Sequence, residues 1–132
     1  MVKDYKFSVI IPIYNNGIYL KNRCINSLKK ISMFEEMEIL LIDDGSTDNE
    51  TLEIVESLER EYENVKAYYF PIGGSGGAAR PRNKGVLLAS SNYVTYLDPD
   101  NEAINDGYSK LYKEIEQDKL DIVLGNYLMV LR

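Results

Sequence analysis

The chain has 132 residues and a formal net charge of −6; 45% of its residues are hydrophobic and 27% are charged. This length and composition predict one soluble globular domain over residues 1–132 and exclude an intrinsically disordered chain. The sequence has no histidine and one cysteine, Cys24, which excludes His-based catalytic triads, internal disulfides and zinc sites built from His or Cys.

The first half of the chain alternates strand and helix patterns. An apolar, β-branched run at residues 7–11 predicts a buried parallel strand. Apolar side chains then recur at helical spacing from Ile18 to Ile31 and predict a helix. Residues 38–42 predict a second buried strand. The helix that follows is expected to begin at Thr47 or Asp48, because either side chain can cap a helix N-terminus.

The second half continues this alternation. In order, it is predicted to hold a strand at 65–70, a glycine-rich loop at 71–77, a helix at 78–90, a strand at 93–97, a helix at 104–117 and the opening of a fifth strand at 121–124. Strands that alternate with helices predict an α/β fold, with a mostly parallel sheet and helices on both of its faces.

Polar residues follow each of the first four predicted strands. These residues are, in order, Tyr14 and Asn15, then Asp43 and Asp44, then the glycine loop that leads to Arg80 and Arg82, then Asp98 and Asp100. In an open parallel sheet, ligands bind beyond the carboxyl ends of the strands. We therefore expect these side chains to share one ligand-binding edge.

Each motif also has a simpler structural interpretation. The segment 43–48 could form only a turn and a helix cap. Residues 74–79 match a dinucleotide-binding pattern, but that pattern belongs after the first strand, where residues 12–15 stand instead. Residues 98–101 could form only a turn that leads into the next helix, with Asp100 or Asn101 as its cap. As two carboxylates at one strand end, Asp98 and Asp100 also suit a hard cation such as Mg²⁺ or Mn²⁺.

Four motifs together resemble a known family. They occupy residues 8–15, 38–48, 77–85 and 96–100 and cover nearly the whole chain. In this order and spacing they resemble the Rossmann-like, nucleotide-binding half of a family 2 glycosyltransferase of the GT-A type. A phosphoacceptor receiver-like domain is an alternative α/β interpretation, but such a domain would need an acid pair after the first strand and a lysine after the fifth.

The resemblance implies a role for each matching residue. The implied nucleotide-binding residues are Pro12, Tyr14, Asn15, Asp43, Asp44, Arg82 and Asp98, and the implied metal ligands are Asp100 and Asp98. Tyr14 would stack on the base, while Asp44 would accept a base N–H in a turn that Asp43 supports. Arg82 would approach the nucleotide or its diphosphate. Arg80 lies outside the core of that motif, so we expect it to matter less.

The resemblance implies transfer of a sugar from a nucleotide-diphospho-sugar, most simply a UDP-sugar, to an acceptor hydroxyl with inversion. Mn²⁺ or Mg²⁺ would be the cofactor, and the acceptor would be a saccharide or a lipid-linked molecule in cell-surface polysaccharide or glycoconjugate synthesis. The catalytic base and the acceptor-binding half are expected beyond Arg132. A non-catalytic nucleotide-sugar-binding module shares every site residue and stays open as an alternative.

Charge and hydropathy bound the location and partners. The overall acidity argues against nucleic-acid binding, although residues 65–92 hold four basic side chains and no acidic one. No apolar run approaches the roughly 18–20 residues of a membrane span, and no signal peptide is evident. A cytoplasmic protein is expected. Peripheral attachment of a full-length protein to the inner face of the membrane and assembly into a homo-oligomer both stay open.

Overall fold

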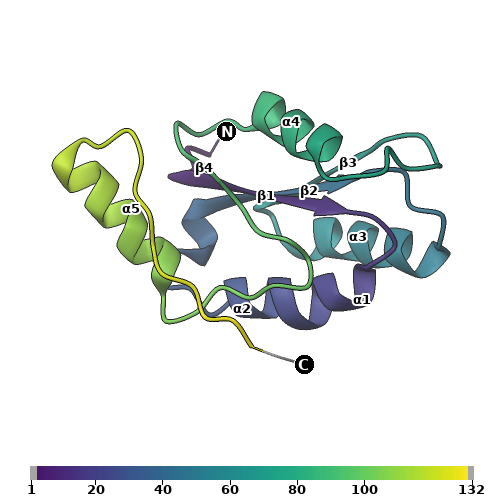
Figure 1. The fold of residues 1–132 in the computed structure, drawn as a ribbon, viewed down its shortest axis with the longest axis horizontal. Helices are drawn as coiled ribbons and strands as arrows, with labels where there is room; N and C mark the ends of the chain where they lie inside the picture. Colours follow the sequence, from purple (N-terminus) through teal and green to yellow (C-terminus); the bar gives the residue numbers. More distant parts are fainter. Residues whose placement is uncertain (1–2, 131–132) are drawn as a thin grey trace.

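A parallel β-sheet forms the centre of the computed structural model, which describes residues 3–130 (Figure 1). Its strands are β1 (Phe7–Ile13), β2 (Met37–Asp43), β3 (Val65–Tyr69) and β4 (Val94–Tyr96), in the order β3-β2-β1-β4. All pairings are parallel, and Ile13 at the end of β1 lies opposite Asp43, which in turn lies opposite Tyr69. The chain therefore leaves β1, β2 and β3 at the same edge of the sheet.

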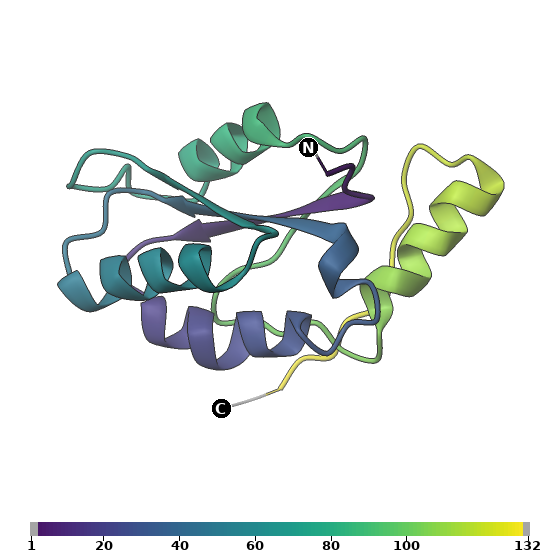
Figure 2. The ribbon, with the colours of Figure 1, turned by 180° about the vertical axis from the view of Figure 1, so that it is seen from behind.

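Helices cover both faces of the sheet, which confirms the predicted α/β architecture. They are α1 (Gly17–Tyr19), the π-helix η1 (Leu20–Ile25), α2 (Asn26–Leu28), the 3-10 helix η2 (Phe34–Glu36), α3 (Asn49–Glu61), α4 (Ala79–Leu88) and α5 (Gly107–Asp118). The run from α1 to α2 lies beside α3 on one face, while α4 lies alone on the other (Figures 1 and 2).

The core follows from the period-2 geometry of the strands. Val9 and Ile11 of β1 belong to the larger core beneath α1, η1 and α3, whereas Ile10 points to the α4 side with Leu40 and Ile42. Alternate residues of a strand point to opposite faces, so a strand covered on both sides needs an unbroken apolar run. This is why β1 and β2 could be recognised from sequence.

Helix α5 packs at the other edge of the sheet through aromatic side chains. The ring centroids of Phe7 and Tyr112 are 5.8 Å apart, and Tyr108 meets Phe7 edge-on at 6.2 Å. The helix begins at Gly107, later than expected, because Asn105 and Asp106 both have positive φ angles, which a helix does not allow.

The expected fifth strand is wrong. Residues 121–130 form no strand; in both views they run back alongside α5, where Gly125 approaches the Leu111 side chain (Figures 1 and 2). Ile122 and Leu124 are 71% and 84% exposed. An apolar run becomes a strand only where a neighbouring strand can pair with its N–H and C=O groups, and none pairs with this segment within residues 3–130.

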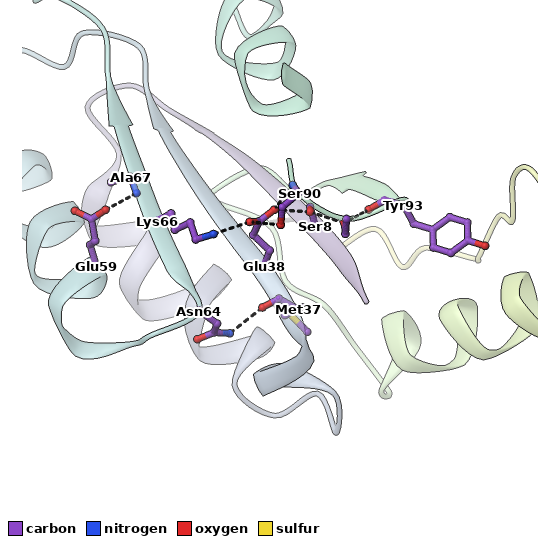
Figure 3. A network of polar contacts seen from close by, with 10 residues as sticks. Ser8, Met37, Glu38, Glu59, Asn64, Lys66, Ala67, Ser90 and Tyr93 are labelled. Carbon is purple, nitrogen blue, oxygen red and sulfur yellow. Dashed lines mark hydrogen bonds and ion pairs between the residues drawn. The ribbon is translucent and has the colours of Figure 1, made fainter. Parts of the chain in front are cut away.

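A buried glutamate joins the starts of three strands (Figure 3). Glu38 of β2 accepts hydrogen bonds from the Ser8 hydroxyl at 2.8 Å, from Lys66 Nζ at 2.9 Å, and from the N–H and hydroxyl of Ser90 at 2.9 and 2.8 Å. Burial alone would raise the pKa of Glu38, but these donors hold it below its ordinary value. The carboxylate is therefore an ionised cross-link between strands, at the opposite end of the sheet from the loops that follow β1, β2 and β3.

Within residues 3–130 no helix has the length and apolar character needed to cross a membrane.

Candidate functional site

A cleft of about 900 Å³ opens beyond the carboxyl ends of the strands. Its lining includes Pro12, Tyr14, Asp44, Gly74, Asp98 and Asp100. Five of the eight residues implied by the resemblance thus face one cavity. Of the other three, Asn15 and Asp43 hold the surrounding loops, and Arg82 reaches the site through its ion pair with Asp98.

Tyr14 follows β1 and presents a half-exposed ring to the cleft. One part of the ring lies against the backbone of Gly74, where a Cβ atom would be only 2.6 Å from Tyr14 Cε1. Gly74 also has a φ angle of +70°, which favours glycine. The glycine loop can therefore pack on Tyr14 only because position 74 lacks a side chain.

Asn15 connects the loop after β1 to the loop after β2. Its side-chain oxygen accepts from the N–H groups of Thr47 and Asp48 at 2.8 and 3.1 Å, and its amide donates to the Thr47 hydroxyl at 2.8 Å. Its own N–H donates to the Ser46 hydroxyl at 3.0 Å. Asn15 thus holds the loops after β1 and β2 together and does not itself line the cleft.

Asp48 is the helix cap predicted for α3. Its carboxylate accepts from the N–H of Thr51 at 2.6 Å and so satisfies a free donor in the first turn. The Thr51 hydroxyl in turn accepts from the N–H of Gly17 at 3.0 Å, which ties the start of α1 to the start of α3. The segment 43–48 therefore contains a turn and a cap as well as cleft-lining chemistry.

Asp43 fixes the turn that presents Asp44. The buried carboxylate of Asp43 accepts from the N–H groups of Gly45 and Ser46 at 3.2 and 3.1 Å, and also from the Ser46 hydroxyl. Gly45 adopts a φ angle of +85°, and a Cβ there would collide with the Pro71 carbonyl. The supporting role that the resemblance implied for Asp43 matches this geometry.

Asp44 is only 3% exposed although its side chain borders the cleft. One oxygen, Oδ2, accepts from the N–H and hydroxyl of Ser75 at 3.0 and 2.6 Å. The other, Oδ1, accepts from Arg80 Nε at 2.8 Å and lies 2.7 Å from Arg80 Nη2. Burial raises the pKa of Asp44, but Ser75 and Arg80 together hold it below its ordinary value, so the group is ionised at neutral pH.

Arg80 is the site residue that the sequence interpretation undervalued. Besides its ion pair with Asp44, its guanidinium lies 4.1 Å from the centroid of the Phe70 ring. The signal in the sequence was the acid-free stretch 65–92, which contains Arg80 but does not say which of its cations reaches the site.

Arg82 and Asp98 form a direct ion pair, with Arg82 Nη2 at 2.9 Å from Asp98 Oδ1. The Arg82 guanidinium also lies 5.6 Å from the Tyr96 ring centroid. Its Nε is buried and has no hydrogen-bond acceptor within residues 3–130. The resemblance gave these two residues separate roles toward a nucleotide, whereas here they contact each other.

Asp98 and Asp100 both line the cleft, so they could hold one cation together. Residues 3–130 contain no group of three or more Asp, Glu, His or Cys side chains arranged to hold a metal. Two carboxylates, one of them paired with Arg82, are an incomplete shell for Mg²⁺ or Mn²⁺, which take six oxygen ligands. Such a site suits an ion that arrives with oxygen ligands of its own.

Two further lining residues come from the helix after β1. Tyr19 and Arg23 border the same cleft, with the Arg23 guanidinium 4.9 Å from the Tyr19 ring centroid. The sequence interpretation used residues 18–31 only for their apolar face and missed both. No motif signals them: Tyr19 ends α1, and Arg23 lies in the π-helix η1, whose winding differs from the α-helical spacing that a sequence pattern assumes.

Sequence comparison identifies relatives of nearly the whole chain. Glycosyltransferase GlyG of Streptococcus pneumoniae is 35% identical over 120 residues, which are 91% of this chain and 38% of GlyG. A poly(ribitol-phosphate) beta-glucosyltransferase of Bacillus spizizenii is 32% identical over 121 residues, 91% of this chain and 19% of that enzyme. The chain thus spans well under half of each of these two relatives.

Structure comparison agrees. TarS of S. aureus, residues 1–349, superposes with a TM-score of 0.75 at 33% identity, over 84% of this chain and 32% of that one. A mannosyltransferase of Pyrobaculum calidifontis shares the fold at 18% identity with a TM-score of 0.68. The family described as "Glycosyl transferase family 2" matches residues 8–130. The chain therefore belongs to glycosyl transferase family 2 and has the GT-A fold.

Proposed function

We propose that this chain binds a UDP-sugar and forms the donor-binding part of an enzyme that transfers the sugar to an acceptor hydroxyl. The observation that carries the proposal is the shared cleft of Tyr14, Asp44, Asp98 and Asp100. It combines an aromatic face for a base, a buried acceptor for a base N–H, and carboxylates for a cation. TarS, 33% identical over most of this chain, has been solved with UDP-GlcNAc, which supports a uridine nucleotide.

The proposed division of roles follows the resemblance. Pro12, Tyr14, Asn15, Asp43, Asp44, Arg82 and Asp98 make up the nucleotide-binding part of the site, some by contact and some by holding a loop. Asp44, ionised at neutral pH, acts as an acceptor and so favours a base with a ring N–H, such as uracil. Arg82 forms an ion pair with Asp98, and its guanidinium suits the anionic diphosphate.

Mn²⁺ or Mg²⁺ is the proposed cofactor. Asp100 would contribute a direct ligand, and Asp98 would act with it or face the sugar. The bound ion would neutralise the leaving diphosphate. The two carboxylates provide the oxygen chemistry that such ions require, and diphosphate oxygens and water would complete the shell.

The remaining proposals concern the longer enzyme. Transfer with inversion needs a general base that takes the proton of the acceptor hydroxyl, and we expect that base beyond Arg132. The proposed acceptor is a saccharide or lipid-linked molecule used in cell-surface polysaccharide or glycoconjugate synthesis, and the proposed location of the enzyme is the cytoplasm. Two relatives are named as transferases that act on poly(ribitol-phosphate), which supports a polymer as the acceptor.

Calorimetric titration of this chain with UDP, UDP-GlcNAc and ADP, with Mn²⁺ present, tests the proposal. UDP and UDP-GlcNAc should bind more tightly than ADP. Asp44→Asn should weaken the binding of UDP at least about tenfold, because the substitution replaces an acceptor oxygen with a donor. Equal affinity for UDP and ADP would overturn it. Binding without turnover in a longer form of the protein would favour the non-catalytic module.

A further inference from the structure

The Asp44 carboxylate has no acceptor position left for a ligand. An ionised carboxylate offers about four lone-pair sites. Here two are taken by the N–H and hydroxyl of Ser75 on Oδ2, and two by the guanidinium of Arg80 on Oδ1. A nucleobase N–H can reach Asp44 only if one of these donors leaves.

We infer that Arg80 is a positioning residue that orients Asp44 for base recognition, and that Ser75 is an internal stand-in which the base N–H displaces. The inference rests on the proposed function. In this arrangement Oδ1 of Asp44 keeps its contacts with Arg80 when the ligand binds. Oδ2 of Asp44 loses a hydrogen bond from Ser75 and accepts one from the base N–H instead.

Arg80 is the donor that stays, because it is held from several sides. Both of its contacts with Oδ1 are shorter than 3 Å, and Nη2 also donates to the Asp44 carbonyl at 3.4 Å. The guanidinium lies over Phe70 at 4.1 Å. It projects from α4, which packs on the sheet through buried Pro81 and Gly85. A charged, two-pronged contact from a packed helix is costly to break.

Ser75 is the donor that leaves, because its loop borders open space at Gly73 and Gly76 and is held mainly at Gly74 and by the Gly73 N–H, which donates to the Gly45 carbonyl at 2.9 Å. Gly73 and Gly76 flank it with left-handed φ angles of +133° and +88°, and a Cβ at either would meet no atom within 4 Å. The same loop places Gly74 against the Tyr14 ring. A shift of this loop would therefore free Oδ2 and uncover more of Tyr14 together, which are the acceptor and the stacking surface that a base needs.

The proposed arrangement makes a specific claim about base selection. Uracil presents a ring N–H at N3, whereas the cytosine N3 is an acceptor that an ionised carboxylate repels. Arg80 fixes the direction of Oδ2, so losing Arg80 should reduce the preference for UDP over CDP. If Arg80 had a merely structural role, its loss would weaken the binding of UDP and of CDP by the same factor.

The test measures dissociation constants for UDP and CDP in the wild type, Arg80→Ala, Arg80→Lys and Ser75→Ala. Lys84→Ala is the matched control, because it removes a cation from the same helix whose amino group lies over Tyr68 instead. Thermal unfolding of each variant checks that the fold survives. If Arg80→Ala fails to fold, Arg80→Lys still tests the inference, because it keeps the positive charge but lacks the planar guanidinium that contacts Oδ1 through two nitrogens.

We expect Arg80→Ala to reduce the UDP-to-CDP preference about tenfold or more, Arg80→Lys to restore part of it, and Lys84→Ala to leave it unchanged. Ser75→Ala should bind UDP about two- to fivefold more tightly, because one competing donor is gone. An unchanged preference in folded Arg80 variants, or weaker UDP binding by Ser75→Ala, would overturn the inference. A wild type that binds no UDP would instead overturn the proposed function.

Discussion

Arg82 Nη2 donates to Asp98 Oδ1 at 2.9 Å and so ties helix α4 to the segment that follows β4. Both side chains are about 40% exposed (39% and 41%). An ion pair at that exposure adds little to stability, because water screens it. Its consequence is for binding: Arg82 is held at the cleft, beside the carboxylates, where an anionic ligand can compete for it.

Arg82→Ala should weaken UDP binding about tenfold and uridine binding much less, because the guanidinium suits the diphosphate and not the nucleoside. Calorimetric titration with the two ligands measures the difference. Arg60→Ala, which removes an exposed cation at the end of α3, is the control and should change neither affinity. Equal losses for UDP and uridine would mean that Arg82 positions the base or the fold.

Glu38→Ala should destabilise the protein by about 2–4 kcal/mol, because it removes a buried carboxylate that accepts from buried Ser8 and from the N–H and hydroxyl of Ser90. Urea unfolding at pH 7 measures the change. Glu36→Ala, at an exposed neighbouring glutamate in η2, is the control and should cost about 0.5 kcal/mol or less. Near-equal losses in the two variants would contradict the cross-linking role of Glu38.

The pH dependence of the protein's stability should reflect the ionisation of Glu38. The pKa of Glu38 is lower in the folded protein than its ordinary value of 4.5. Its stabilising contribution is therefore complete above pH 4.5 and is lost as the pH falls below 4.5 through the folded-state pKa. Urea unfolding from pH 7 to pH 3 should show a steeper fall in the wild type than in Glu38→Gln. Parallel curves would sink this prediction.

Gly85→Ala should destabilise the protein by about 1–3 kcal/mol, because the new Cβ would clash with the Ile10 side chain beneath α4. The absence of a side chain at this position lets α4 approach β1 closely, which also sets where Arg80 and Arg82 project. Thermal unfolding measures the cost, and Val86→Ala on the exposed side of α4 is the control. A stabilised Gly85→Ala variant would show that helix propensity outweighs the contact.

The sequence predicted the elements that depend on local pattern. Strands β1 and β2 carry unbroken apolar runs, and Asp48 caps α3 as its side chain allows. The segment at 121–124 has three apolar residues in a row, Ile122 to Leu124, but no strand within residues 3–130 pairs with it. Pattern reports the tendency to be buried, whereas a strand also depends on a partner, which a single sequence does not reveal.

In the candidate site, too, the sequence predicted some features and missed others. Motif spacing correctly grouped Tyr14, Asp44 and Asp100 at one cleft, because strand ends in a parallel sheet share an edge. It did not anticipate the pairing of Arg80 with Asp44. That contact depends on the path of the glycine loop and the pitch of α4, which three-dimensional packing decides. Sequence thus indicated which residues gather at the site but not which of them contact one another.

The last prediction concerns the metal, and it follows from the incomplete ligand shell. Asp98 and Asp100 alone should bind Mn²⁺ weakly, and a donor diphosphate should supply the missing oxygens, so the two ligands should bind with positive coupling. Linkage makes this coupling reciprocal, with a size of about 1–3 kcal/mol. The measurement is UDP affinity with Mn²⁺ and with EDTA. Asp100→Ala should abolish the difference and leave thermal unfolding unchanged, since Asp100 is exposed. Asp118→Ala, at the far end of α5, should keep it. Wild-type UDP affinity that does not respond to Mn²⁺ would leave residues 98–101 as a simple turn, closed by the bond from the Asn101 N–H to the Asp98 carbonyl at 3.0 Å.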